Sequence, residues 1–221
     1  MINERRGVKI MKIEVWSDYV CPFCYIGKRR LEEAIEQTGL GDKVEVVFKA
    51  YQLDPNSPKE SDESMQVGLA EKYGMSIEEA KKMTDNVEVQ AKSVGLSYDF
   101  GKMTPANTFD AHRIAKLAEQ EGVAPTVTER LLKAYFVEGE KIGREDVLLR
   151  LAEEAGVVRD RVKEVLDSDE FSEDVRMDIA EAGQIGVKGV PFFVIDRKYA
   201  ISGAQPAEVF ADALRKAINE G

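Results

Sequence analysis

The sequence has few of the residues that build metal centres and no segment suited to crossing a membrane. Its 221 residues include two cysteines, one histidine and one tryptophan. These thiols and the imidazole are too few for the usual four-ligand zinc site within one chain. No stretch reaches the roughly 20 apolar residues of a membrane-spanning helix. We therefore expect no bound metal and no membrane partner.

The charge balance is acidic. Asp and Glu number 41 against 31 Lys and Arg, for a formal net charge of −10. Nucleic-acid binding needs clustered basic residues, so DNA and RNA are not expected partners. The one dense basic run, Lys28 to Arg30, is interpreted as a solvated helix face.

The first ten residues, 1–10, are polar and carry no apolar signal core. We expect them to form a loose leader, with translation starting at Met1 or at Met11. Without a secretion signal, the predicted location is the cytoplasm. In that compartment a chain whose two cysteines are close together is typical of catalysis or metal binding rather than of a structural disulfide.

The two cysteines, Cys21 and Cys24, stand two residues apart between a predicted strand, Met11 to Trp16, and a predicted helix that runs to Gln37. Pro22 suits the first turn of that helix. A helix N-terminus favours a thiolate, so we expect Cys21 to be reactive and open to solvent. Cys24, one turn further on, is expected on the inner face. The pattern predicts dithiol–disulfide exchange.

Strand patterns bracket a long helical block. A second strand is predicted over 43–51, and two more over 192–195 and 199–202, joined by a turn at 196–198 and followed by a final helix. Helices are predicted over 61–73, 76–95, 107–121, 125–137, 144–154, 160–166 and 171–182. The expected α/β chain has one discontinuous domain, 11–54 with 184–221, and an all-helical insertion, 55–183.

Three segments carry a family resemblance: Ser17 to Gly27, with its Cys-Pro-Phe-Cys; Gly189 to Val194, with its Val-Pro; and Asn107 to Arg113. Together they resemble the FrnE-like branch of the DsbA family of thiol–disulfide oxidoreductases. The resemblance implies a thioredoxin-like mixed sheet, with the helical insertion between its second and third core strands.

The resemblance also implies roles for the site residues. Cys21 is the implied nucleophile, and Cys24 resolves the mixed disulfide. Pro191 aligns with a cis proline beside the disulfide, where Val190 and Pro191 contact substrate. The periplasmic oxidant of the family has histidine where Phe23 stands, so this chain is not expected to be strongly oxidising. Pro22 stiffens the turn, and Phe23 supplies apolar surface at the mouth of the site.

The remaining candidates are in the insertion and around the first strand. His112, the sole histidine, is interpreted as a partly buried, hydrogen-bonded side chain or, with Asn107, as lining a substrate groove. Trp16 is interpreted as core or as a redox-sensitive fluorophore. Asp18 is interpreted as a solvated loop charge or, alternatively, as a modulator of the cysteine pKa.

Three functions are compatible with these residues. The first is a cytoplasmic oxidoreductase acting on protein or small-molecule thiols and disulfides, with no bound cofactor and with glutathione as a candidate electron partner. The second is a glutathione-dependent enzyme of the kappa transferase or 2-hydroxychromene-2-carboxylate isomerase type, which usually carries serine where Cys21 stands. The third is a chaperone-like binding module. The chain is expected to be a monomer or a homodimer.

Overall fold

The computed structural model describes residues 4–5 and 8–220, with side chains from Ile10 onward. These residues form two compact units, one made of 1–51 with 178–221 and the other of 52–177. Within the expected leader, β1 (Glu4–Arg5) pairs antiparallel with β2 (Val8–Lys9). Residues 1–3 and 6–7 of that leader lie outside the described residues.

The first unit contains a mixed four-stranded sheet in the order β4-β3-β5-β6. The central strand β3 (Met11–Ser17) pairs parallel with β4 (Val44–Ala50) and antiparallel with β5 (Phe192–Ile195). The hairpin strand β6 (Tyr199–Ser202) completes the sheet. This confirms a thioredoxin-like sheet whose second and third core strands are separated by a long insertion.

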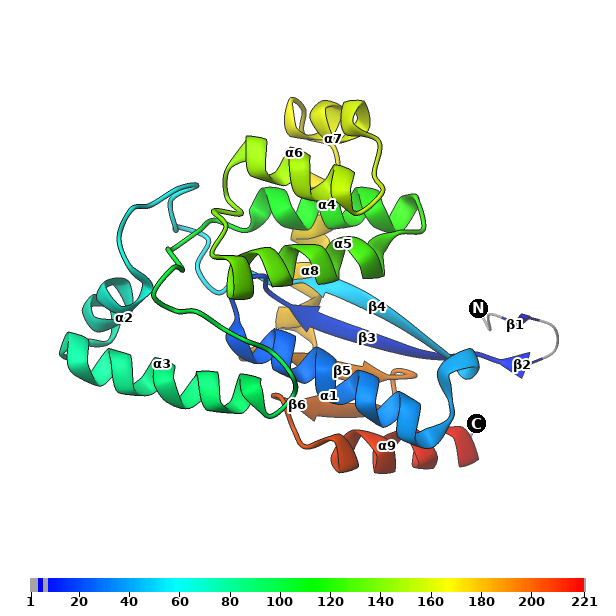
Figure 1. Ribbon diagram of the computed structural model, residues 1–221. Coiled ribbons are helices and arrows are strands. Elements are labelled where there is room, and N and C mark those ends of the chain that lie inside the picture. Colours follow the sequence, from blue (N-terminus) through cyan, green and yellow to red (C-terminus); the bar gives the residue numbers. More distant parts are fainter. Residues whose placement is uncertain (1–3, 6–7, 221) are drawn as a thin grey trace. The chain divides into compact units, whose positions relative to one another are not determined.

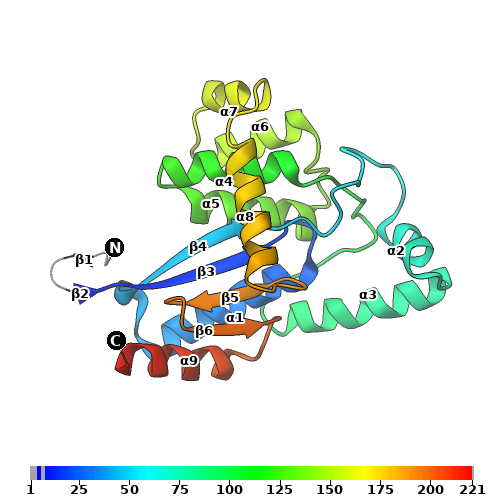
Figure 2. The ribbon, with the colours of Figure 1, turned by 180° about the vertical axis from the view of Figure 1, so that it is seen from behind.

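Alternation along β3 divides the sheet into two faces. Met11, Ile13 and Val15 pack in one apolar core with α1 (Pro22–Thr38) and α9 (Ala207–Asn219), which cover that face (Figure 1). The opposite face carries the end of α8 (Ser172–Gln184), which Figure 2 shows in front of the sheet. There Trp16 packs against Val187, Val194 and Ala182, the last of these from α8. The predicted first strand, first helix and final helix are thus confirmed.

The turn between β5 and β6 is built from left-handed backbone. Asp196 and Arg197 have φ of 48° and 57°. The Asp196 carboxylate accepts a hydrogen bond from the Lys12 amide at 2.8 Å, and the Asp196 amide donates to the Lys12 carbonyl. These bonds tie the hairpin turn to β3 and confirm the turn predicted at 196–198.

The second unit is helical. Its helices are α2 (Met65–Tyr73), α3 (Ile77–Lys92), α4 (Phe109–Gln120), α5 (Ala124–Lys133), α6 (Glu145–Glu154), α7 (Arg159–Leu166) and the first part of α8 (Ser172–Gln184). The predicted capping box opens α3, where Ser76 accepts from the Glu79 amide and Glu79 accepts from the Ser76 amide. A short 3-10 turn, η1 (Gly41–Lys43), precedes β4 in the first unit.

Two helix predictions were wrong in detail. The helix predicted from Ser61 begins at Met65, because Ser64 caps it and Ser61 instead accepts a local bond from the Glu63 amide. The helix predicted over 125–137 changes at Ala134 into a π-helical segment, η2 (Ala134–Glu138).

The boundary of the first unit also differs from the expected one at α8. Residues from Asp178 onward belong with the sheet. The reason is hydrogen bonding: Asp178 accepts from the indole of Trp16 through its main-chain carbonyl and from the Ala50 amide through its side chain. The helix pattern carries no sign of these partners.

Candidate active site

The two cysteines lie where β3 passes into α1. Cys21 is the N-cap residue, with φ −88° and ψ 110°, and Pro22 is the first helical residue. The Cys24 amide donates to the Cys21 carbonyl at 3.0 Å, which closes the first turn around the pair. Proline costs nothing at this position because the first amides of a helix have no intrahelical acceptor.

Both cysteines are buried free thiols. Cys21 is 3% exposed and Cys24 is 2% exposed. The expectation that Cys21 lies open to solvent was therefore wrong. The Cys21 thiol donates to the Val190 carbonyl at 3.4 Å, so the loop before β5 packs directly against the Cys21 sulfur. Cys21 and Val190 are 169 positions apart, so no local sequence pattern could predict that this loop covers the sulfur.

The loop before β5 completes the site. Its Val190–Pro191 peptide bond is cis, as the resemblance implies. The Pro191 carbonyl accepts from the Gly203 amide at 2.8 Å, which fastens this loop to the segment after β6. Cys21, Cys24, Val190 and Pro191 are thus brought together from two distant parts of the chain.

The Cys24 thiol is hard to ionise. Burial raises its pKa well above the usual value, and a hydrogen bond and charge from Cys21 raise this pKa further. Weaker hydrogen bonds from the Ser17 side chain and the Asp18 main chain lower the same pKa. Cys24 therefore stays protonated to a higher pH than an ordinary thiol does.

Ser17 is a site residue whose role the sequence did not predict, whereas the alternative in which Asp18 modulates a cysteine pKa agrees with its main-chain hydrogen bond to Cys24. Asp18 is 1% exposed, so its interpretation as a solvated loop charge was wrong. Its main-chain carbonyl accepts from the Cys21 amide at 3.1 Å. Trp16 is fully buried, as the core interpretation expects. The position of Ser17 at the end of β3, directly before the cysteine loop, was the available signal.

Pro22 and Phe23 occupy the turn between the cysteines. Pro22 is partly exposed, and Phe23 is 36% exposed, the most open side chain of the motif. An apolar ring at this place can contact an apolar substrate segment. Its role in tuning or binding stays a prediction.

Asn107 and His112 belong to the helical unit. The Asn107 side-chain amide donates to the carbonyls of Pro55 and Ser57, at 3.0 and 3.1 Å, and its oxygen accepts from the Phe109 amide. Asn107 thus fastens the loop before α2 to the start of α4. His112 is 4% exposed within α4. Their part in substrate binding stays a prediction.

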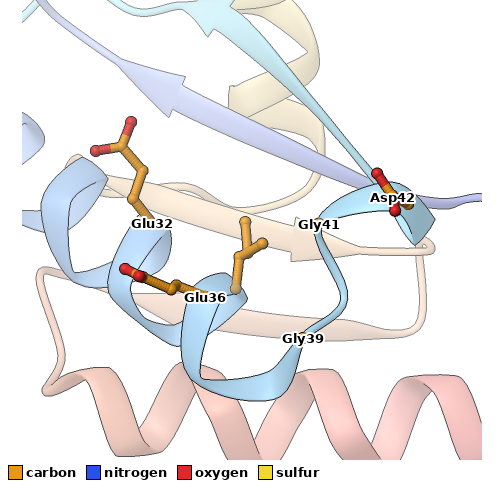
Figure 3. A pocket seen from close by; sticks show the side chains of 6 residues that line it. Glu32, Glu36, Gly39, Gly41 and Asp42 are labelled. Carbon is orange, nitrogen blue, oxygen red and sulfur yellow. The ribbon is translucent and has the colours of Figure 1, made fainter.

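The opposite end of α1 bears an open, acidic hollow of about 420 Å³, shown in Figure 3. Glu32, Glu36 and Asp42 line it, together with Ile35 and two glycines. Glu32 is already paired with Lys28 and Arg29.

Among the described residues, no three His, Cys, Asp or Glu side chains are grouped to hold a metal ion. No described helix is long and apolar enough to span a bilayer.

Comparison with known proteins identifies the family. Residues 12–215 match the model of the DSBA-like thioredoxin domain. The chain belongs to this family. A crystal structure of a probable DsbA oxidoreductase from Streptomyces coelicolor is 39% identical, with a TM-score of 0.91 over 96% of this chain and 91% of that one.

Two further relatives show how far the fold extends. The uncharacterized protein YwbO of Bacillus subtilis is 29% identical over 91% of this chain and 94% of its own. A 2-hydroxychromene-2-carboxylate isomerase structure is 16% identical, with a TM-score of 0.68 over 95% of this chain and 97% of its own. The latter likeness concerns the fold alone. The DSBA-like fold therefore does not by itself identify the reaction that the protein catalyses. The reaction has to be inferred from the residues of the site.

Proposed function

We propose that the protein is a thiol–disulfide oxidoreductase that works through Cys21 and Cys24. The observation that carries the proposal is the placement of these cysteines at the first turn of α1, with Cys21 against the Val190 carbonyl. A pair kept only for packing would not need a helix N-terminus, and a glutathione-dependent isomerase does not need a second thiol. Membership of the DSBA-like family supports the same chemistry.

The exchange runs in two balanced steps. The Cys21 thiolate attacks one sulfur of a substrate disulfide, forming a mixed disulfide and releasing the other substrate sulfur as a thiolate that takes up a proton. Cys24 then loses its proton and attacks Cys21 Sγ, which closes the protein disulfide and releases the second substrate thiol. Two electrons pass from the protein dithiol to the substrate, and the reverse sequence oxidises a substrate dithiol.

The raised pKa of Cys24 fits the second role. Because burial, with smaller contributions from Cys21, holds Cys24 protonated in the free dithiol, Cys24 does not compete with Cys21 for the substrate disulfide. Bonding of Cys21 to the substrate removes the neighbouring charge that opposed ionisation of Cys24. Cys24 then ionises more readily, with burial still opposing its charge, and resolves the mixed disulfide. We propose protein or small-molecule thiols as substrates and glutathione as the electron partner.

Two single substitutions test the proposal. Cys21→Ser should abolish insulin disulfide reduction, because no nucleophile is left at the helix N-terminus. Cys24→Ser should retain the first step and accumulate mixed disulfides, which mass spectrometry of non-reduced protein detects. Full activity in Cys21→Ser would overturn the assignment and favour a glutathione-dependent or binding role.

A further inference from the structure

A glycine on α1 lies at the contact between that helix and the loop that covers the cysteines. Gly27, one turn after Cys24, is buried. A Cβ atom built on it would lie 3.0 Å from Pro191 Cγ and 3.1 Å from Phe193 Cζ, with Ala204 Cβ at 3.5 Å. The first two contacts are shorter than side chains ordinarily tolerate. Glycine therefore allows α1 and the Pro191 loop to approach this closely.

The loop has little freedom to move away. The Pro191 carbonyl accepts from the Gly203 amide at 2.8 Å, and Arg30 of α1 donates to the Ala204 carbonyl. Phe193 is fully buried, with its ring 4.7 Å from that of Phe210. A methyl group at position 27 must therefore separate the first turns of α1 from Pro191 by a few tenths of an ångström.

That separation acts on the hydrogen bond between the Cys21 thiol and the Val190 carbonyl, which spans 3.4 Å from sulfur to oxygen and comes from a weak donor. The bond exists only while Cys21 carries its proton. Neither the thiolate nor the disulfide can donate it. Its loss therefore disfavours the protonated dithiol relative to both other forms.

We propose that Gly27 is a positioning residue, which sets the redox balance of the cysteine pair by letting the Val190–Pro191 loop contact Cys21. The proposal rests on the proposed exchange function and names a residue that influences the redox equilibrium of the cysteine pair. Gly27 touches no reacting atom. It acts through Pro191, whose place determines whether the Val190 carbonyl reaches the sulfur.

The equilibrium with glutathione tests the proposal. In that reaction two glutathione thiols give up two electrons and two protons, the Cys21–Cys24 bond breaks, and oxidised glutathione forms. For Gly27→Ala we expect the equilibrium constant to shift about three- to tenfold toward the protein disulfide, the range that corresponds to one modest hydrogen bond. An unchanged constant in the folded variant would overturn the proposal.

Gly183→Ala is the matched control. Gly183 also lies in a helix, α8, and a Cβ there meets nothing within 4 Å. Both substitutions raise helix propensity to a similar extent. The control should leave the glutathione equilibrium unchanged, and an equal shift in it would show that position 27 has no special role.

A second measurement separates this proposal from the exchange function. In a Cys24→Ser background Cys21 is the only thiol, and its alkylation by iodoacetamide at neutral pH reports thiolate formation without any exchange. Adding Gly27→Ala should raise the rate severalfold, even if the wild-type protein proves unable to exchange with glutathione. An unchanged rate would overturn the positioning role and leave the proposed function untouched.

A variant that fails to fold would be replaced by a paired one. Phe193→Leu removes the Cζ atom that the new methyl would meet at 3.1 Å and leaves the Pro191 contact at 3.0 Å in place. Gly27→Ala combined with Phe193→Leu should still shift the glutathione equilibrium relative to Phe193→Leu alone. Equal constants for these two proteins would count against the contact with Pro191.

Discussion

The two units stabilise buried charge in different ways. In the helical unit a single cation, Arg113, is 4% exposed and donates to the main-chain carbonyls of Val165, Ser168 and Glu170. Its one anionic partner is Asp110, at 2.9 Å. One guanidinium thus links three carbonyls and a carboxylate, and it holds the loop between α7 and α8.

In the sheet unit the charges form a shared network. Lys49 lies 2.9 Å from Asp178 and 3.6 Å from Glu181, and Arg197 pairs with both Glu181 and the buried Glu14. Most members thus have a second partner of opposite charge. We call Arg113 a hub, because one cation serves several partners. A network should tolerate the loss of one charge better than a hub does, because the charges that remain still have partners of opposite sign.

The largest effect should come from removing the hub. Arg113→Ala removes a charged donor from the carbonyls of Val165, Ser168 and Glu170, the first of these bonds being buried, and leaves Asp110 with Lys59. We therefore expect a loss of about 3 kcal/mol in the free energy of unfolding. Urea denaturation followed by circular dichroism measures it. Arg176→Ala, which removes an exposed guanidinium 5.6 Å from the Phe109 ring, should cost less than about 1 kcal/mol. Equal losses in the two variants would contradict the hub interpretation.

A smaller effect should follow from removing one charge of the network. Asp178→Asn keeps an oxygen that can accept from the Ala50 amide, and Lys49 keeps Glu181. We therefore expect a loss of about 1 to 2 kcal/mol in the same denaturation experiment. A loss as large as that of Arg113→Ala would show that the network does not compensate, and the contrast between the units would fail.

The smallest effect concerns acid stability of the helical unit. Burial raises the pKa of Asp110, but hydrogen bonds from Lys59 and Arg113 outweigh it and hold this pKa below its ordinary value. The resulting stabilisation is complete above the unfolded-state value, near 3.8, and is lost as pH falls through the lower folded-state value. Asp110→Asn should flatten the fall in urea midpoint over this acid range. An identical fall in variant and wild type would exclude Asp110 as its source.

Most elements of the fold could be predicted because their signals are local. Alternation in β3, the serine–glutamate box before α3 and the turn at Asp196 each depend on neighbours within a few residues. The predictions that were wrong involve groups far apart in sequence or a local competitor. Ser61 formed its own turn instead of capping a helix, and Asp18 was buried by the fold around it.

The spacing of Cys21 and Cys24 and the proline between them were sufficient to predict a helix N-terminus bearing two thiols, because that geometry needs only four consecutive residues. The burial of Cys21, its bond to the Val190 carbonyl and the close approach of Pro191 to Gly27 required folding of the whole sheet unit. Those contacts join residues more than 160 positions apart, and packing between elements, rather than any local preference, brings them within reach of the sulfur.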